Sequence, residues 1–136
     1  MSNIEQTLSI LKPDAVERNL DEKIKSIFVK EGFKIVKEKK IKLEKVDAEK
    51  FYKVHETKPF YNDLCEYLSS GPVVAMVLEK ENAVSSNRQI MGATDPKNAD
   101  EGTIRKQFGI SIDKNSVHGS DSIENAKKEI NFFFKD

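Results

Sequence analysis

Consecutive apolar residues from Val73 to Leu78 place the strongest constraint on how this chain can fold. The run follows Gly71-Pro72, a pair that interrupts regular structure, and it is far too short to span a bilayer. A strand with one face in water alternates apolar and polar residues, whereas a strand covered on both faces is apolar throughout. We therefore predict a central strand over residues 73–78, buried on both faces.

The rest of the chain alternates predicted strands and helices. Apolar spacing predicts strands over 7–11, 33–43 and 116–117, the second one bulged around 37–40, and helices over 20–28, after Asp47, after Pro59, over 82–91, over 103–108 and after Asp121. Residues 92–102 lack periodicity, and a loop of that length is usually functional or disordered. The 136 residues suffice for a single domain over 1–136. This α+β order favours a ferredoxin-like split βαβ sheet.

The segment Asn-Ser-Val-His-Gly-Ser-Asp-Ser contains one of the two histidines, His118. Residues 116–117 are predicted to form a short strand, Gly119 to let the backbone turn, and Asp121 to cap the next helix. Glu129 lies two turns along that helix, close enough to orient an imidazole if the helix folds back. Histidine titrates near neutral pH and serves in catalysis, but a histidine at a strand end often only caps or packs. Both interpretations remain open from this segment alone.

Several polar residues scattered along the chain would make a phosphate site if they met His118. Lys12 follows the first strand, Arg88 lies on the helix before the long loop, Thr94 in that loop, and Arg105 in the turn after it. Together they would form a cationic pocket suited to a polyphosphate. The alternative is that 23 basic residues always supply a few near any site. No P-loop and no Gly-x-Gly-x-x-Gly motif is present, so nucleotide binding must use side chains.

Composition narrows the partners and the compartment. Lysine plus arginine balances aspartate plus glutamate at 23 each, so no basic field predicts specific binding to nucleic acid. The first twenty residues lack a signal-peptide pattern, and we expect a cytoplasmic protein without a membrane partner. Cys65 is the only cysteine, which excludes an internal disulfide and indicates a buried structural thiol in a reducing compartment. The two histidines are far apart, so we predict no dedicated protein metal site; Mg²⁺ could still arrive with phosphates.

Six short motifs follow one another in order along the chain. They are Lys12-Pro13-Asp14, Lys58-Pro59-Phe60, Ser70-Gly71-Pro72-Val73, Met91-Gly92-Ala93-Thr94-Asp95-Pro96, Gly102-Thr103-Ile104-Arg105 and Asn115-x-x-His118-Gly119-Ser120-Asp121-Ser122. Together they resemble the nucleoside diphosphate kinase family over residues 5–134. The short end at Asp136 is similar to that of bacterial members. The resemblance implies a ferredoxin-like βαββαβ fold with a four-stranded antiparallel sheet and flanking helices.

The resemblance also implies an activity and its catalytic residues. Family members transfer the terminal phosphate of a nucleoside triphosphate to a nucleoside diphosphate by a ping-pong mechanism, with Mg²⁺. His118 would attack through Nδ1 to give a phosphohistidine, and Glu129 would accept a hydrogen bond from the other ring nitrogen. Ser120 would steady Glu129 through a hydrogen bond. Tyr52 would lie with its hydroxyl in reach of both Lys12 and His118.

The same resemblance assigns nucleotide-binding roles. The phosphates would be held by Lys12, Arg88, Thr94 and Arg105. Asn115 and Lys12 would contact the sugar hydroxyls, while Phe60 and Ile112 would enclose the base without reading its edges, which implies low base specificity. By spacing alone Phe60 and Ile112 would be packing residues. Without the resemblance, Tyr52 could equally well pack in the core, and Ser120 could simply cap the last helix.

The family resemblance further implies a homo-oligomer, for which we expect a hexamer rather than a tetramer. We also expect association because the three phenylalanines over residues 132–134 offer more apolar surface than one helix face can bury. Two other functions remain open from fold alone, because ferredoxin-like sheets also serve as modules that bind nucleic acid or regulatory ligands. A catalytically silent nucleotide-binding relative is the third possibility, against which the intact His118, Glu129, Lys12 and Arg105 argue.

Overall fold

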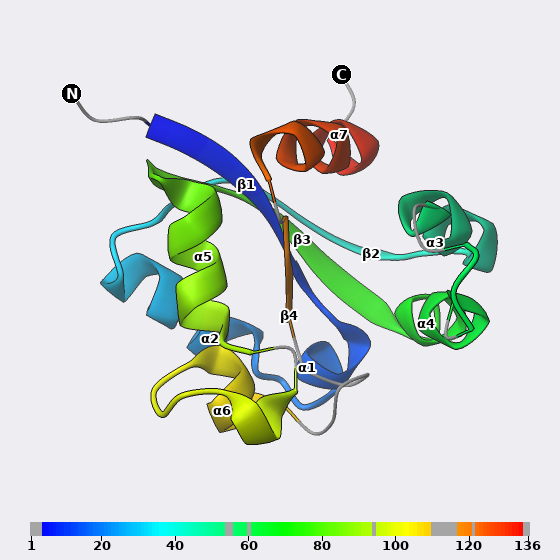
Figure 1. Ribbon diagram of the computed structural model, residues 1–136, viewed down its shortest axis with the longest axis horizontal. Helices are drawn as coiled ribbons and strands as arrows, with labels where there is room; N and C mark the ends of the chain where they lie inside the picture. The colour runs from blue at the N-terminus through cyan, green and yellow to red at the C-terminus, as the bar shows by residue number, and fades with distance from the viewer. Residues whose placement is uncertain are drawn as a thin grey trace.

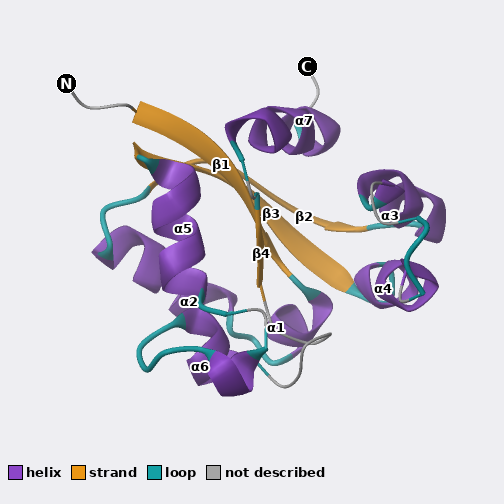
Figure 2. Cartoon of the chain, viewed as in Figure 1, coloured by secondary structure: helices purple, strands orange, loops and turns teal. Residues whose placement is uncertain are grey.

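The computed structural model describes residues 4–53, 56–59, 61–93, 95–109, 117–120 and 122–134 (Figures 1 and 2). Its sheet contains β1 (Ile4–Leu11), β2 (Lys34–Lys42), β3 (Pro72–Glu81) and β4 (Val117–Gly119) in the order β2-β3-β1-β4. All three pairings are antiparallel. This is the predicted ferredoxin-like topology, with β1 and β3 in the centre and the short β4 at one edge.

The apolar run lies in β3 and is buried at every position from Val73 to Leu78, as predicted. Side chains of β1 and β3 alternate between two cores. The α2/α5 core contains Leu11, Val74 and Met76, and the α3/α4/α7 core contains Ile10 and Ala75. Both faces of the sheet are therefore covered, which explains why β3 carries no alternating polar residue.

The helices divide between the two faces (Figure 1). The first face is covered by α1 (Pro13–Glu17), α2 (Asp21–Lys30), α5 (Ala83–Met91) and α6 (Ile104–Phe108), each of which contributes to the α2/α5 core. The second face is covered by α3 (Lys45–Phe51), α4 (Tyr61–Leu68) and α7 (Ile123–Phe133), which supply the α3/α4/α7 core. A 3-10 helix, η2 (Pro96–Asn98), lies within the stretch predicted to be a loop.

Several local predictions were wrong at the ends of elements. Helix α3 begins two residues before Asp47, because Glu44 and Asp47 form a capping box in which Asp47 accepts a hydrogen bond from the Glu44 amide. Helix α7 is capped by Ser122, whose hydroxyl accepts from the Asn125 amide at 3.1 Å, and not by Asp121. The bulge in β2 falls between Ile35 and Lys37, just before the predicted position.

The phenylalanines at the end of α7 are not surplus apolar surface. Phe133 is buried, and Phe132 and Phe134 pack against the α3/α4/α7 core. The argument for association from these three residues is therefore wrong. Cys65 is buried in the same core, as predicted. Within the described residues, no helix has the length and apolar character needed to cross a membrane.

Candidate active site

His118 reaches its position through the pairing of the first and last strands. Its neighbours in β4 face the first side of the sheet, where Val117 joins the α2/α5 core and Gly119 contacts α5. His118 pairs with Ile10 of β1 and faces the opposite side, toward α3 and α7. Its side chain is 21% exposed, so the ring is held by protein on most sides and open to a small ligand on the remainder.

Glu129 of α7 holds one nitrogen of the His118 ring. Its Oε1 lies 2.9 Å from His118 Nε2. Because a carboxylate only accepts hydrogen bonds, this contact places a proton on Nε2, so the lone pair of the neutral imidazole lies on Nδ1. The neutral ring, with Nε2 anchored, is the form that can act as a nucleophile through Nδ1.

Ser120 supports this carboxylate. Its hydroxyl donates to the same Glu129 Oε1 at 2.8 Å and accepts a hydrogen bond from the Leu8 amide at 3.3 Å. Ser120 is completely buried and is not the cap of α7, a position that Ser122 takes. The side chain therefore links β1 to the residue that orients His118.

Tyr52 is the C-cap residue of α3, and its ring lies beside the imidazole. The two ring centroids are 6.4 Å apart in an edge-to-face arrangement. Burial, helped by the negative charge of Glu129, raises the pKa of the Tyr52 phenol well above its ordinary value. The hydroxyl therefore stays protonated and can donate a hydrogen bond near His118.

Arg105 is a buried cation that contacts the backbone of β4. Its Nη1 donates to Gly92 O and its Nη2 to Val117 O, both at 3.0 Å, while its Nε is buried without a hydrogen-bond partner among the described residues. Burial and the charge of Arg88 lower the pKa of Arg105 to about 10, which still leaves the guanidinium charged near neutral pH. The exposed Arg88 of α5 therefore lies close enough to add to the same positive potential.

Lys12 lies at the same end of the sheet. It directly follows Leu11, which pairs with Val117, and it is almost completely buried at the N-cap position of α1. Its backbone carbonyl accepts hydrogen bonds from the amides of Ala15 and Val16. Four other residues with predicted roles, namely Phe60, Thr94, Ile112 and Asn115, lie outside the described residues.

Gly119 was predicted to let the backbone turn, but the structure shows a different reason for a glycine at this position. It does not have a left-handed backbone, unlike Gly32, Gly92 and Gly102. A Cβ on Gly119 would instead lie 2.3 Å from Asn87 Nδ2 and 2.8 Å from Met91 Cε. The glycine is therefore required because α5 approaches β4 closely, and not because the chain turns there.

Sequence reasoning missed two groups of residues around the site. Phe51 packs against His118, although its spacing indicated only an apolar helix face.

The second group surrounds Asp14, which is buried and accepts hydrogen bonds from the Tyr67 hydroxyl and from Arg18 at 3.1 Å. Arg18 also donates to Phe108 O, so this network ties α1 to α4 and to the end of α6. The Lys-Pro-Asp motif was the only signal in the sequence for such a network.

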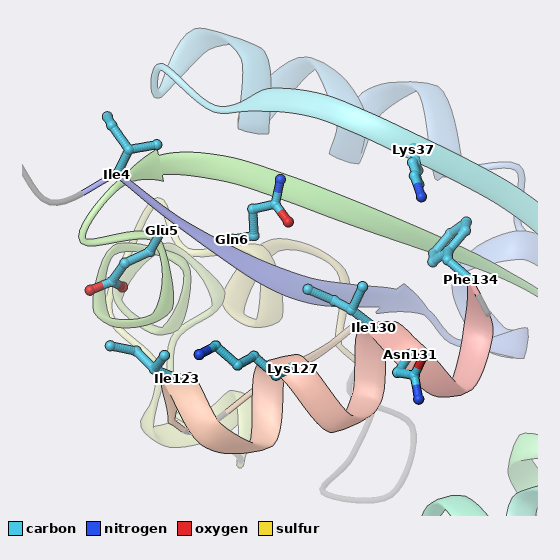
Figure 3. Close-up of a pocket in the computed structure, with 9 residues that line it drawn as sticks. All are labelled: Ile4, Glu5, Gln6, Lys37, Ile123, Lys127, Ile130, Asn131 and Phe134. Carbon is cyan, nitrogen blue, oxygen red and sulfur yellow. The ribbon is translucent and has the colours of Figure 1, made fainter. Parts of the chain in front are cut away.

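A groove of about 680 Å³ lies between α7 and the sheet (Figure 3). It is lined by Ile4, Glu5, Gln6, Lys37, Ile123, Lys127, Ile130, Asn131 and Phe134. None of the predicted catalytic or nucleotide-binding residues that the structure describes is among them. Among the residues that the structure describes, no group of three or more His, Cys, Asp or Glu side chains could hold a metal ion.

Comparison with known proteins gives a consistent result over almost the whole chain. The family model described as nucleoside diphosphate kinase matches residues 5–136. A nucleoside diphosphate kinase of Nitratiruptor sp. is 61% identical over 131 residues, which are 96% of each chain. A protein of the same name from Campylobacter curvus is 60% identical over 131 residues, again 96% of each chain.

Solved structures are similar as well. The nucleoside diphosphate kinase of Aquifex aeolicus superposes with a TM-score of 0.96 at 45% identity, covering 98% of this chain and 96% of that one. The apo enzyme of the same name from Encephalitozoon cuniculi has a TM-score of 0.94 at 38% identity, with coverage of 97% and 90%.

Proposed function

Since the chain belongs to the nucleoside diphosphate kinase family and transfers phosphate from a nucleoside triphosphate to a nucleoside diphosphate, we propose that His118 carries the phosphate between them. In the first half-reaction the Nδ1 lone pair attacks the terminal phosphorus and the bond to the β-phosphate oxygen breaks, releasing the diphosphate. In the second, a β-phosphate oxygen of another diphosphate attacks the phosphohistidine and the N–P bond breaks.

One observation carries this proposal, the 2.9 Å contact between His118 Nε2 and Glu129 Oε1. It supports an imidazole whose free lone pair is on Nδ1. As the N–P bond forms, positive charge develops on the ring, and the carboxylate stabilises it. Ser120 keeps that carboxylate in position, and the protonated Tyr52 hydroxyl supplies a donor beside the reacting group.

Substrate binding is assigned to the cationic side of the site. Lys12, Arg88 and Arg105 are proposed to hold the phosphates together with Thr94, and their charge offsets the charge spread over the transferring group. The Nε of Arg105, which is buried without a hydrogen-bond partner among the described residues, supports this role. Asn115 and Lys12 are proposed to contact the sugar. Phe60 and Ile112 are proposed to enclose the base, so purine and pyrimidine nucleotides should be accepted within modest factors.

Mg²⁺ is proposed as the cofactor, bound mainly by nucleotide phosphate oxygens. The donor set of the described residues fits this arrangement, because Glu129 is engaged by His118 and Ser120 and no carboxylate cluster is present there. Mg²⁺ commonly binds through substrate phosphates and waters rather than through an all-protein cage. When bound, it would supply charge neutralisation on the phosphates.

The test of the nucleophile is incubation with γ-labelled ATP and Mg²⁺, followed by acid or base treatment of the protein. The wild type should retain label in base and lose it in acid, as phosphohistidine does. His118→Ala should form no labelled enzyme and transfer no phosphate, while His55→Ala, which changes the only other histidine, should behave as the wild type. Label or turnover in His118→Ala near that of the wild type would refute the assignment.

A cytoplasmic location and a homo-oligomer complete the proposal. The single cysteine supports a reducing compartment, in which the enzyme would maintain nucleotide pools. Exposed apolar side chains at Ile4, Val29 and Val36 support association, and a hexamer is preferred to a tetramer. Light scattering at micromolar concentration should give the mass of six chains. A mass of four would exclude the hexamer, and a mass of one would exclude association.

A further inference from the structure

The Phe51 ring lies directly against the imidazole of His118. The ring centroids are 5.3 Å apart and the ring planes meet at 74°, an edge-to-face contact closer than that of Tyr52 with the same imidazole. Aromatic pairs at this separation attract one another beyond the apolar area that they bury. Phe51 is the last residue of α3, so its ring comes from a different helix than Glu129.

Phe51 is itself held by other aromatic rings. Its centroid lies 5.1 Å from that of Tyr52, 5.6 Å from that of Phe132 and 5.4 Å from that of Phe133. The last two residues belong to α7, the helix that also carries Glu129. The surface that contacts the imidazole is therefore fixed to the same helix as the carboxylate that binds Nε2.

We propose that Phe51 is a positioning residue for the phosphate-accepting imidazole, an inference that rests on the proposed role of His118. The hydrogen bond to Glu129 holds a single ring atom, and a ring held at one atom can still pivot about it. Packing against Phe51 removes that freedom and fixes the direction of the Nδ1 lone pair. A nucleophile must approach phosphorus in line with the leaving oxygen, so its rate depends on this direction.

A residue that only filled the core would behave differently. Replacing such a residue would lower the stability of the protein without changing the rate at which His118 reacts. The chain offers a matched control on the other face of the sheet. Phe33 forms an edge-to-face pair with Phe28, with centroids 5.9 Å apart, and it is buried in the α2/α5 core, on the face of the sheet opposite to the His118 side chain.

The first experiment measures phosphoenzyme formation in a single turnover, by rapid quench with γ-labelled ATP over a range of concentrations. Phe51→Leu should lower the limiting rate about ten- to a hundred-fold, with the nucleotide concentration at half-maximal rate changed less than about threefold. Phe51→Tyr retains the ring and should restore most of the rate. Phe51→Met keeps apolar volume without a flat face and should show the same loss of rate, so it can replace Phe51→Leu if that variant folds poorly. Phe33→Leu should lose stability and keep the rate.

The second experiment records the imidazole directly, by ¹⁵N NMR of histidine in a His55→Gln background where only His118 gives a signal. The wild type should show a single form with the proton on Nε2, and Phe51→Leu should show a second tautomer or an exchange-broadened signal. An unchanged limiting rate together with a single tautomer in Phe51→Leu and Phe51→Met would refute this inference. If His118→Ala formed phosphoenzyme, the proposed nucleophile itself would be wrong, so the two failures are distinguishable.

Discussion

Replacing Ser120 with alanine should destabilise the protein far more than a surface serine would. The hydroxyl is completely buried and takes part in two hydrogen bonds, one to Glu129 Oε1 at 2.8 Å and one from the Leu8 amide at 3.3 Å. Alanine fits the same space but supplies neither the donor to Glu129 nor the acceptor for the Leu8 amide. The Leu8 amide and one carboxylate oxygen of Glu129 would then lose this partner inside the protein.

The magnitude follows from the surroundings of each group. A buried amide left without a partner costs about 1–3 kcal/mol. The bond to Glu129 is charge-assisted, but this side chain is 20% exposed, so water replaces part of what is lost and about 1 kcal/mol remains. The sum of about 2–4 kcal/mol corresponds to a fall in Tm of about 7–14 °C for a chain of this size. Because Glu129 can still contact His118, transfer should slow less than about tenfold.

Thermal unfolding and a coupled phosphate-transfer assay at a temperature where every variant is folded would measure both effects. Ser122→Ala is the control, because it removes another serine hydroxyl, the α7 cap that accepts from Asn125, at a cost of about 1 kcal/mol and with no contact to the carboxylate. If Ser120→Ala lowered Tm no more than Ser122→Ala does, the two buried hydrogen bonds of Ser120 would contribute no more to stability than the helix cap of Ser122, and the prediction would be wrong.

Two further predictions concern packing and pH. Gly119→Ala should lower the free energy of unfolding, measured in urea, by about 1–3 kcal/mol, because the new Cβ would lie 2.3 Å from Asn87 Nδ2. The control Gly71→Ala should leave that free energy almost unchanged, because its new Cβ would have its nearest contact at 3.5 Å. Equal losses in the two variants would contradict the close approach of α5 to Gly119. Burial and the hydrogen bond to Asp14 raise the pKa of Tyr67 above its ordinary value of 10.0. Above that pH the unfolded chain releases a proton that the folded protein keeps, so the free energy of unfolding falls as pH rises. Tyr67→Phe should give a shallower fall in unfolding free energy between about pH 9 and 11, and parallel curves for the two proteins would refute this.

The layers of the fold could be predicted because they follow from short-range patterns. The apolar run over 73–78 has one physical solution, a strand covered on both faces, and the spacing of Ile24 and Phe28 on one helix face could be read directly. Helix starts were predicted less well. The capping box at Glu44 and Asp47 uses side chains that also occur throughout the exposed surface, so its position could not be distinguished beforehand.

The surroundings of His118 could be predicted only in part. The family motif pointed to Glu129 and Ser120, and the structure brings both into contact with one another and with β4. The contact with Phe51 could not be predicted, because it depends on how α3 packs against α7 and no periodicity records the packing of one helix on another. The role of Gly119 was misread for the same reason, since a missing side chain looks alike whether the chain turns or a neighbour approaches.

The central position of β1 has a consequence for how the active site is assembled during folding. The amide of Leu8 bonds to Ser120, 112 positions later, and Ile10 pairs with His118. Closing so long a loop is costly in chain entropy, and pairings of this separation form slowly compared with local helices. The nucleophile, its carboxylate and the serine between them come together only when the two ends of the chain have met. Label incorporation in a refolding reaction therefore reports the completed topology, after the far-ultraviolet signal of the helices has already returned.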